Sequence, residues 1–136
     1  EAKKAFRNSL AFVSEDGKGY YLSNGSGEKI GTKVWEDALP FITSEPTAVK
    51  LNGKWGYIDK EGNVVLQPQY EEALPFTNGF APVKIDGKWG YIDSENYKLV
   101  IPAEFDEVKE ISKNGFTFVR EENQWYKLSL YRFNYN

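Results

Sequence analysis

The chain has 136 residues and a formal net charge of −3, from 17 Lys and Arg against 20 Asp and Glu, and this length fits one globular domain. Its basic residues are scattered, which argues against a nucleic-acid partner, and it has no Cys and no His, which removes thiolate chemistry and the commonest general base. We therefore expect no catalytic residues, no metal site and no cofactor, and the lack of a run of about 20 apolar residues predicts no membrane insertion by this segment.

The first predicted element is a lead or linker at residues 1–9, which a single domain follows at residues 10–136. The chain begins at Glu1 and contains no Met, so we expect it to be a piece of a longer protein. Alternating apolar and polar residues, separated by Asn-Gly or Asp-Gly turns, predict strands and hairpins along the domain. The predicted strands lie near residues 10–14, 19–23, 46–50, 54–59, 64–67, 80–85, 88–93, 98–101, 116–120 and 124–130.

A tandem repeat organises these strands. Residues 52–59, Asn-Gly-Lys-Trp-Gly-Tyr-Ile-Asp, return almost unchanged at residues 86–93, 34 residues later. A weaker copy lies at residues 16–23, with Gly19 in place of the Trp, and a decayed copy lies at residues 123–128. The repeat divides the domain into four units, at about residues 10–45, 46–79, 80–115 and 116–136.

Each unit is predicted to contain a hairpin and a third element. In the second unit, Trp55 and Gly56 lie in the second strand of the hairpin, where the Gly would let a neighbouring backbone or ring approach closely. Pro68 marks the end of the next strand. The third element, residues 70–76, has apolar residues three positions apart, which fits a bulged strand and one helical turn equally well.

Neighbouring acids recur in this third element, as Glu71-Glu72 and as Asp106-Glu107. Such pairs could be imagined as the acid and the nucleophile of a glycosidase, but neighbours on a strand point to opposite sides of the sheet. We therefore interpret these carboxylates as part of a solvated face.

One unit exposes an apolar face that only a neighbouring unit can cover, and the tandem copies provide that neighbour. We expect an all-β tandem repeat array of about four three-stranded antiparallel β units, stacked as an open, solenoid-like array. A small β-propeller is the alternative, and the short fourth unit favours the open array. The predicted repeat core consists of Trp55, Gly56, Tyr57, Trp89, Gly90, Tyr91 and Trp125.

Residues 46–108 resemble the WG-repeat family of bacterial proteins, also called KWG repeats, with the match carried by Gly53 to Asp59 and Gly87 to Asp93. The resemblance implies a β-rich repeat module, often found in exported or envelope proteins, without a general biochemical activity. We accordingly expect a module that is not an enzyme, that serves protein interaction or structural support, and that is located outside the cell or in the envelope.

The segments 17–22 and 52–59 are also similar to the hairpins of choline-binding and glucan-binding cell-wall repeats, whose aromatics cage a quaternary ammonium or stack on sugars. This resemblance implies an alternative function, a module that binds cell-wall glycan. Gly56 and Gly90 stand where the second aromatic of such a cage would lie, so we rank glycan binding below protein interaction or structural support. Its candidate ligand-facing aromatics are Tyr20, Tyr21, Tyr57 and Tyr91.

Overall fold

The structure is a computed structural model that describes residues 10–14 and 16–130, so the predicted lead at 1–9 and the last six residues lie outside it. The described residues form strands and no helix, which confirms the all-β class. The strands are β1 (Ala11–Ser14), β2 (Tyr20–Ser23), β3 (Lys29–Trp35), β4 (Asp37–Ala38), β5 (Thr47–Leu51), β6 (Lys54–Ile58), β7 (Val64–Tyr70), β8 (Glu72–Ala73), β9 (Phe80–Ile85), β10 (Lys88–Asp93), β11 (Leu99–Phe105), β12 (Glu107–Val108), β13 (Phe116–Glu121) and β14 (Gln124–Ser129).

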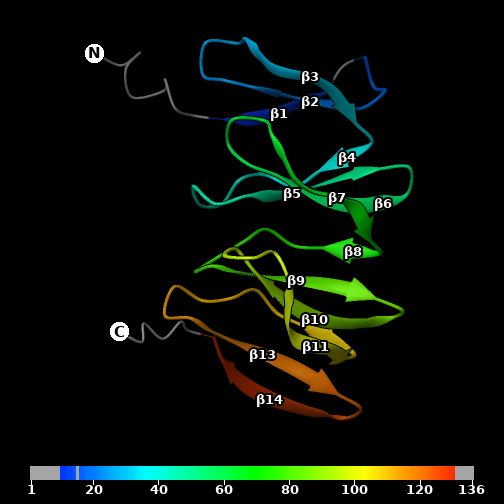
Figure 1. Cartoon of the computed structure of the whole chain (residues 1–136), viewed down its shortest axis with the longest axis vertical. Coiled ribbons are helices and arrows are strands. Elements are labelled where there is room, and N and C mark those ends of the chain that lie inside the picture. Colours follow the sequence, from blue (N-terminus) through cyan, green and yellow to red (C-terminus); the bar gives the residue numbers. More distant parts are fainter. Residues whose placement is uncertain (1–9, 15, 131–136) are drawn as a thin grey trace.

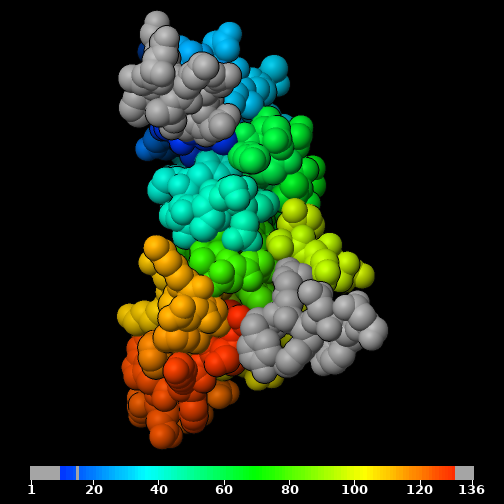
Figure 2. Space-filling view, turned by 90° about the vertical axis from the view of Figure 1, so that its left-hand side faces the viewer, coloured from blue at the N-terminus to red at the C-terminus, as the bar shows by residue number. Residues whose placement is uncertain are grey.

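Four small antiparallel sheets are stacked in chain order along the long axis of the molecule (Figure 1). Sheet 1 contains β1–β3, sheet 2 contains β4–β7, sheet 3 contains β8–β11 and sheet 4 contains β12–β14. The space-filling view shows the same elongated order, from blue to red (Figure 2). The first and last sheets lie at opposite ends, so the array is open and the propeller alternative is wrong.

The last segment of each of the first three units joins the sheet of the following unit. After the long third strand of a unit, one residue turns the chain, and a short strand then pairs with the first strand of the following hairpin. In the second unit, Glu71 makes this turn, and Ala73 of β8 then pairs with Val83 of β9. The third element is therefore a bent strand and not a helical turn, and sheets 2 and 3 gain a fourth strand from it.

The third strands are longer than predicted, and β3 was not predicted at all. β7 continues through Pro68 to Tyr70, because three residues of β7 bulge outward opposite the single residue Gly56. Proline is tolerated in such a bulge, where no ladder hydrogen bond needs its missing N–H. β11 passes Pro102 in the same way.

The register of sheet 1 corrects the alignment of the first repeat. Tyr20 pairs with Trp35 at the end of β3, and the same place in sheet 2 is taken by Trp55, which pairs with the last residue of β7. Tyr20 therefore occupies the Trp position and Tyr21 the Gly position. The prediction that Gly19 replaces the Trp is wrong, because the first hairpin connection is longer by one residue than that of sheet 2.

Hydrophobic clusters fill the space between successive sheets. The cluster between sheets 2 and 3 contains Tyr57, Phe76 and Val83, and the ring centroids of Tyr57 and Phe76 lie 4.9 Å apart, edge to face. The cluster between sheets 3 and 4 contains Tyr91 and Val119. Side chains therefore alternate along each hairpin between the preceding and the following sheet, as the pleat of a strand requires.

Candidate functional site

The Trp-Gly pair has a steric basis in the third strand. A Cβ atom added to Gly56 would lie 2.5 Å from the carbonyl oxygen of Leu66, and one added to Gly90 would lie 2.5 Å from that of Ile101. These distances are too short for any side chain, so the three-residue bulges of β7 and β11 can cross the hairpin only over a Gly. The pair is a packing device of the repeat.

The predicted core positions differ in burial. Tyr57 and Tyr91 are completely buried, and Trp89 is 9% exposed. Trp55 is partly buried and packs against the cluster between sheets 2 and 3. Trp125 is 44% exposed, so its place in the predicted core is wrong, because no described strand follows β14 to cover it.

Two of the four candidate ligand-facing aromatics cannot face a ligand. The hydroxyl of Tyr57 donates a hydrogen bond of 2.6 Å to the Leu74 carbonyl inside the stack, and burial raises the pKa of this hydroxyl well above its ordinary value. Burial likewise raises the pKa of Tyr91 to about 12. Tyr20 and Tyr21 in sheet 1 are partly exposed.

Several aromatic rings carry a lysine of the chain itself on one face. The pairs are Lys29 over Tyr21 at 4.8 Å, Lys33 over Trp35 at 5.7 Å, Lys109 over Trp125 at 5.2 Å and Lys127 over Phe116 at 4.2 Å from the ring centroid. A quaternary ammonium would have to compete with these cations for the same ring faces. The rings are therefore poorly prepared for a choline cage.

A carboxylate at the turn that ends each third strand binds the turn of the next hairpin. Glu36 accepts hydrogen bonds from the backbone N–H groups of Asn52 (2.7 Å) and Gly53 (3.1 Å). Glu71 accepts one from Gly87 at 3.0 Å. Glu71 is exposed, as the solvated-face interpretation predicts, and its carboxylate in addition satisfies the following turn.

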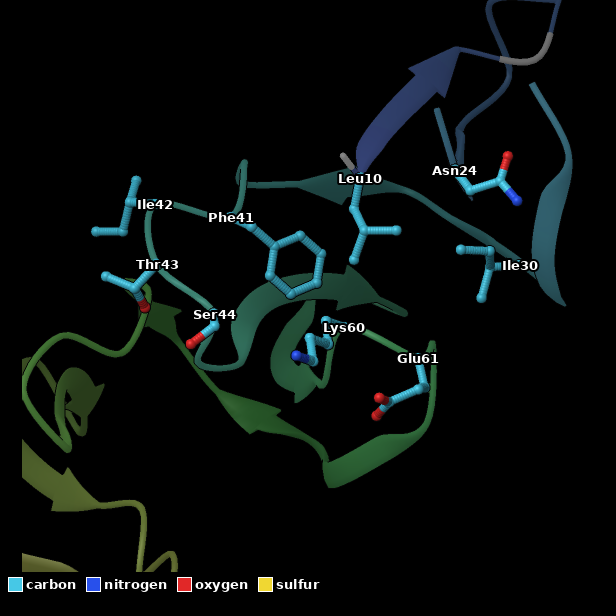
Figure 3. Close-up of a pocket in the computed structure, with 9 residues that line it drawn as sticks. All are labelled: Leu10, Asn24, Ile30, Phe41, Ile42, Thr43, Ser44, Lys60 and Glu61. Atoms are coloured by element: carbon cyan, nitrogen blue, oxygen red, sulfur yellow. The ribbon is translucent and has the colours of Figure 1, made fainter. Parts of the chain in front are cut away.

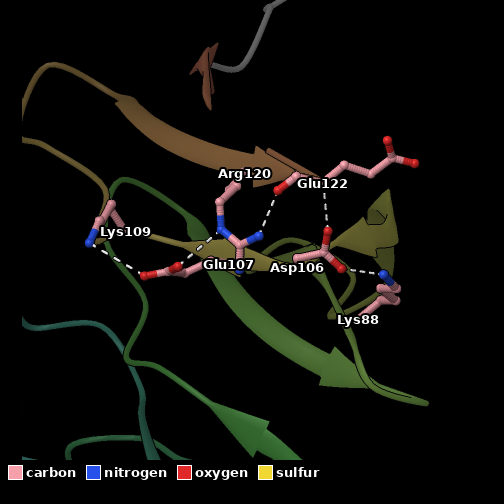
Figure 4. Close-up of polar contacts among 6 residues, drawn as sticks. All are labelled: Lys88, Asp106, Glu107, Lys109, Arg120 and Glu122. Carbon is pink, nitrogen blue, oxygen red and sulfur yellow. Dashed lines mark hydrogen bonds and ion pairs between the residues drawn. The ribbon is translucent and has the colours of Figure 1, made fainter. Parts of the chain in front are cut away.

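Asp106 has the same role in the third unit, where it accepts a hydrogen bond of 2.7 Å from the backbone N–H of Glu122 (Figure 4). Its other oxygen pairs with the ammonium of Lys88. The bond from Lys88, and then that from Glu122, hold the pKa of the Asp106 carboxyl below its usual value. Asp106 is thus also a structural acid, and its side chain remains partly exposed.

The second acid of each pair lies in a short strand and forms an ion pair. Glu72 pairs with Lys84 at 3.3 Å. Glu107 pairs with Arg120 at 3.2 Å and with Lys109 at 3.6 Å (Figure 4). Both acids of each pair are therefore engaged within the fold, and neither pair is arranged as an acid and a nucleophile around a substrate.

A cavity of about 740 Å³ lies where sheets 1 and 2 meet (Figure 3). Leu10, Ile30 and Phe41 supply apolar walls, and the charged groups in its described lining are Lys60 and Glu61. This lining has one carboxylate and lacks the pair of carboxylates that a typical glycosidase places around its substrate. Within residues 10–14 and 16–130, no cluster of three or more acidic side chains is arranged to hold a metal ion.

The hairpin β13–β14 exposes three large aromatic side chains, Phe118 (46%), Trp125 (44%) and Tyr126 (48%), which we call the sheet-4 aromatics. Val119 points into the core toward sheet 3, so its neighbour Phe118 points away from that sheet. Phe118 was not among the predicted site residues, although its alternation with Val119, aligned with the core residue Val83, already indicated an outward side chain.

The repeats match a known family model. A model described as a WG containing repeat matches residues 55–89 and 89–125, which together span 55–125, just over half of the 136 residues. No curated protein and no solved structure matches the chain. The described residues include no helix that is long and apolar enough to cross a membrane.

Proposed function

Since the chain belongs to the WG-containing repeat family, we propose that it is a non-catalytic module that binds a protein partner through the exposed hairpin at the C-terminal end of its array. The observation that carries this proposal is the concentration of large exposed aromatics on β13–β14, in contrast to the buried or partly buried aromatics of the other hairpins. The array would hold this hairpin rigidly relative to the other repeat units. An extracellular or envelope location rests on the family resemblance alone.

A non-catalytic role is supported by the use of the carboxylates. Enzymes need titratable groups that converge on a pocket, with pKa values adjusted to their task. Here Glu36, Glu71 and Asp106 bind backbone turns, and the pKa of Asp106 is lowered by its structural partners. These carboxylates stabilise the stack and do not face a cavity as a group.

A protein partner is supported by the chemistry of the sheet-4 aromatics. Trp and Tyr are enriched where proteins meet, because they bury much apolar area with few rotatable bonds. Arg120 lies opposite Trp125 on the same hairpin and adds a third residue type common at interfaces. A purely structural spacer would need none of these exposed.

The rival function is binding of a cell-wall glycan, which the exposed face of Trp125 could stack on. Two observations place it second. Tyr57 and Tyr91 are buried, so the aromatics do not form a groove along the array. The lysines over Tyr21, Trp35, Phe116 and Trp125 also cover ring faces on which a sugar would have to stack.

Site-specific photo-cross-linking tests the proposal. A photoreactive phenylalanine analogue at Phe118 or Tyr126, in cells that make the full protein, should give a discrete adduct that protease removes and glycosidase does not. The same analogue at Lys60, in the second unit and away from the sheet-4 aromatics, is the control. An adduct sensitive to glycosidase would favour the glycan function, and no adduct at either position would leave the module as a structural support.

A further inference from the structure

An aromatic side chain from a turn packs into the junction between sheets 2 and 3. Tyr97 lies in the turn between β10 and β11, and its ring meets that of Phe76 edge to face, with the ring centroids 5.8 Å apart. Burial and the nearby charge of Asp59 raise the pKa of the Tyr97 hydroxyl, so this hydroxyl lies toward the turn of the preceding unit. Tyr97 therefore fills the space between Phe76 and Asp59.

The corresponding turn of the second unit is shorter. Ile58 pairs with Val64 across residues 59–63, whereas Ile92 pairs with Leu99 across residues 93–98. The later turn thus has one more residue, and it includes Tyr97, whose φ is 56°. Residues 59–63 include no aromatic residue, so this turn has no side chain equivalent to that of Tyr97.

Among the described residues, nothing fills the matching space one junction earlier. Phe41 and Asn24 hold the places in the first unit that Phe76 and Asp59 hold 35 residues later. Both line the cavity of about 740 Å³ where sheets 1 and 2 meet (Figure 3). Phe76 is completely buried, but Phe41 is only partly buried. The volume of the cavity lies within the range of roughly 300–1,000 Å³ that is usual for sites of small organic ligands.

The turn at residues 59–63 contributes one ammonium and one carboxylate to this cavity. Lys60 and Glu61 are neighbours in the turn, and Figure 3 shows their side chains around the same hollow as Phe41. Within residues 10–14 and 16–130, neither side chain forms an ion pair or a hydrogen bond. A ligand that carries both an anion and a cation can therefore pair with both groups.

We propose that this cavity binds a free aromatic amino acid, whose ring takes the place that the Tyr97 side chain holds one junction later. The ring packs on Phe41, the carboxylate pairs with Lys60 and the ammonium pairs with Glu61. The protein itself provides the model for this ligand, because an aromatic amino-acid residue already occupies the equivalent space between sheets 2 and 3. The cavity is separate from the sheet-4 aromatics, so this site goes beyond the proposed binding of a protein partner.

L-Phenylalanine is the probe, titrated into the 136-residue protein while the backbone amides are followed by NMR. Saturable shifts are expected at residues 41–44 and 59–63 and not at residues 118–126. L-Alanine has both charges but no ring and should give no saturable shift. Phenethylamine lacks the carboxylate and should bind about two- to fivefold more weakly, because an exposed ion pair contributes little. N-acetyl-L-phenylalanine amide lacks both charges and should bind at least about fourfold more weakly.

Two substitutions in the turn test the assignment of the charges. Lys60→Gln should weaken the binding of L-phenylalanine about two- to fivefold and leave that of phenethylamine unchanged, since phenethylamine has no carboxylate. Glu61→Gln should weaken the binding of both ligands. An equal loss for both ligands in Lys60→Gln would overturn the proposal.

A turn graft tests the equivalence with Tyr97. Replacing residues 59–63 by the sequence of residues 93–98 brings a Tyr beside Phe41, so it should abolish the binding of L-phenylalanine and raise the melting temperature by filling the cavity. The absence of saturable shifts with L-phenylalanine in the wild type, or undiminished binding by the graft variant, would overturn the proposal. Tighter binding of N-acetyl-L-phenylalanine amide than of L-phenylalanine would also overturn it, because the occupant would then be a residue within a polypeptide.

Discussion

The carboxylate of Glu36 accepts a hydrogen bond of 2.7 Å from the backbone N–H of Asn52, 16 residues later in the chain. Asn52 and Gly53 both have positive φ angles, of 54° and 78°, as a tight hairpin turn of this kind requires. The contact joins the end of one unit to the turn of the next hairpin, and Glu71 and Asp106 repeat it further along the array. Successive units are thus joined by hydrogen bonds at the hairpin turns as well as by hydrophobic contacts in the core.

Replacing Glu36 by Ala should lower the free energy of unfolding by about 1–2 kcal/mol, because two backbone N–H groups lose a charged acceptor and water replaces it only in part. Urea denaturation measures this change. Glu72→Ala is the matched control: that carboxylate forms an exposed ion pair with Lys84, and its loss should cost less than about 1 kcal/mol. Equal losses of unfolding free energy for the two substitutions would show that the contact of Glu36 with the turn stabilises the protein no more than an exposed ion pair.

Gly56→Ala should destabilise the protein by at least about 2 kcal/mol, because the new Cβ would lie 2.5 Å from the Leu66 carbonyl oxygen and β7 would have to shift. Tyr126→Ala changes the same repeat position in sheet 4, where no described third strand crosses, and should stay within about 1 kcal/mol of the wild type. Thermal melts of both variants decide the matter. A well-tolerated Gly56→Ala would mean that the bulge is not held against the hairpin.

The hairpins of the middle units could be predicted because their turns and their alternation are local. Asn52-Gly53 and Asp86-Gly87 mark the turns directly. The path of the third strand could not be predicted, since nothing local shows that three residues around Pro68 bulge opposite the single residue Gly56. Such a bulge depends on pairing between separate strands and not on the local sequence alone.

The site was harder to predict because the exposure of a side chain depends on whether a later strand covers its unit. Trp125 aligns with Trp89, but the structure describes neither a third strand beside β14 nor a further sheet after sheet 4, so Trp125 is exposed where Trp89 is buried. The alignment of sheet 1 failed because Gly-Lys-Gly imitates Gly-Lys-Trp at residues 17–19. The better indicator was the aromatic residue that comes 15 or 16 residues after each of the first three Trp positions, which pairs Tyr20 with Trp35.

Trp89→Ala should cost about 3–5 kcal/mol, as expected for removal of a large buried aromatic side chain. Trp125→Ala, at the same repeat position but 44% exposed, should cost about 1 kcal/mol or less. Thermal melts, with titration of choline and soluble glucans beside them, test both variants. Near-normal melting of Trp89→Ala together with lost ligand binding would refute its assignment to the core and support the glycan function.

Tyr57→Phe should lower stability by about 1–2 kcal/mol, because the 2.6 Å hydrogen bond to the buried Leu74 carbonyl is lost and an acceptor remains unsatisfied. Tyr91→Phe is the matched change one unit later. Its hydroxyl interacts with Thr117 but makes no hydrogen bond of normal geometry to any residue that the structure describes, so its removal should cost less than removal of the Tyr57 hydroxyl. Urea denaturation of both variants measures the two losses in unfolding free energy. A larger loss for Tyr91→Phe would contradict the stabilising role of the Tyr57 hydrogen bond.

Asp106 should make the stability of the protein depend on pH in the acid range. Lys88 and the Glu122 N–H hold the pKa of its carboxyl below the value of about 3.9 for an unfolded chain. As the pH falls, this carboxyl is therefore protonated in the unfolded chain before it is protonated in the folded protein. Its contribution to stability is complete above a pH of about 3.9 and is lost as the pH falls through the pKa of the folded protein. Asp106→Asn keeps the shape and removes the charge, so the difference in melting temperature from the wild type should be largest near neutral pH and vanish in strong acid. Lys88→Ala should raise the pKa of Asp106, which NMR of the carboxyl group measures. A difference between wild type and Asp106→Asn that stays constant with pH would show that the charge on Asp106 does not stabilise the junction of sheets 3 and 4.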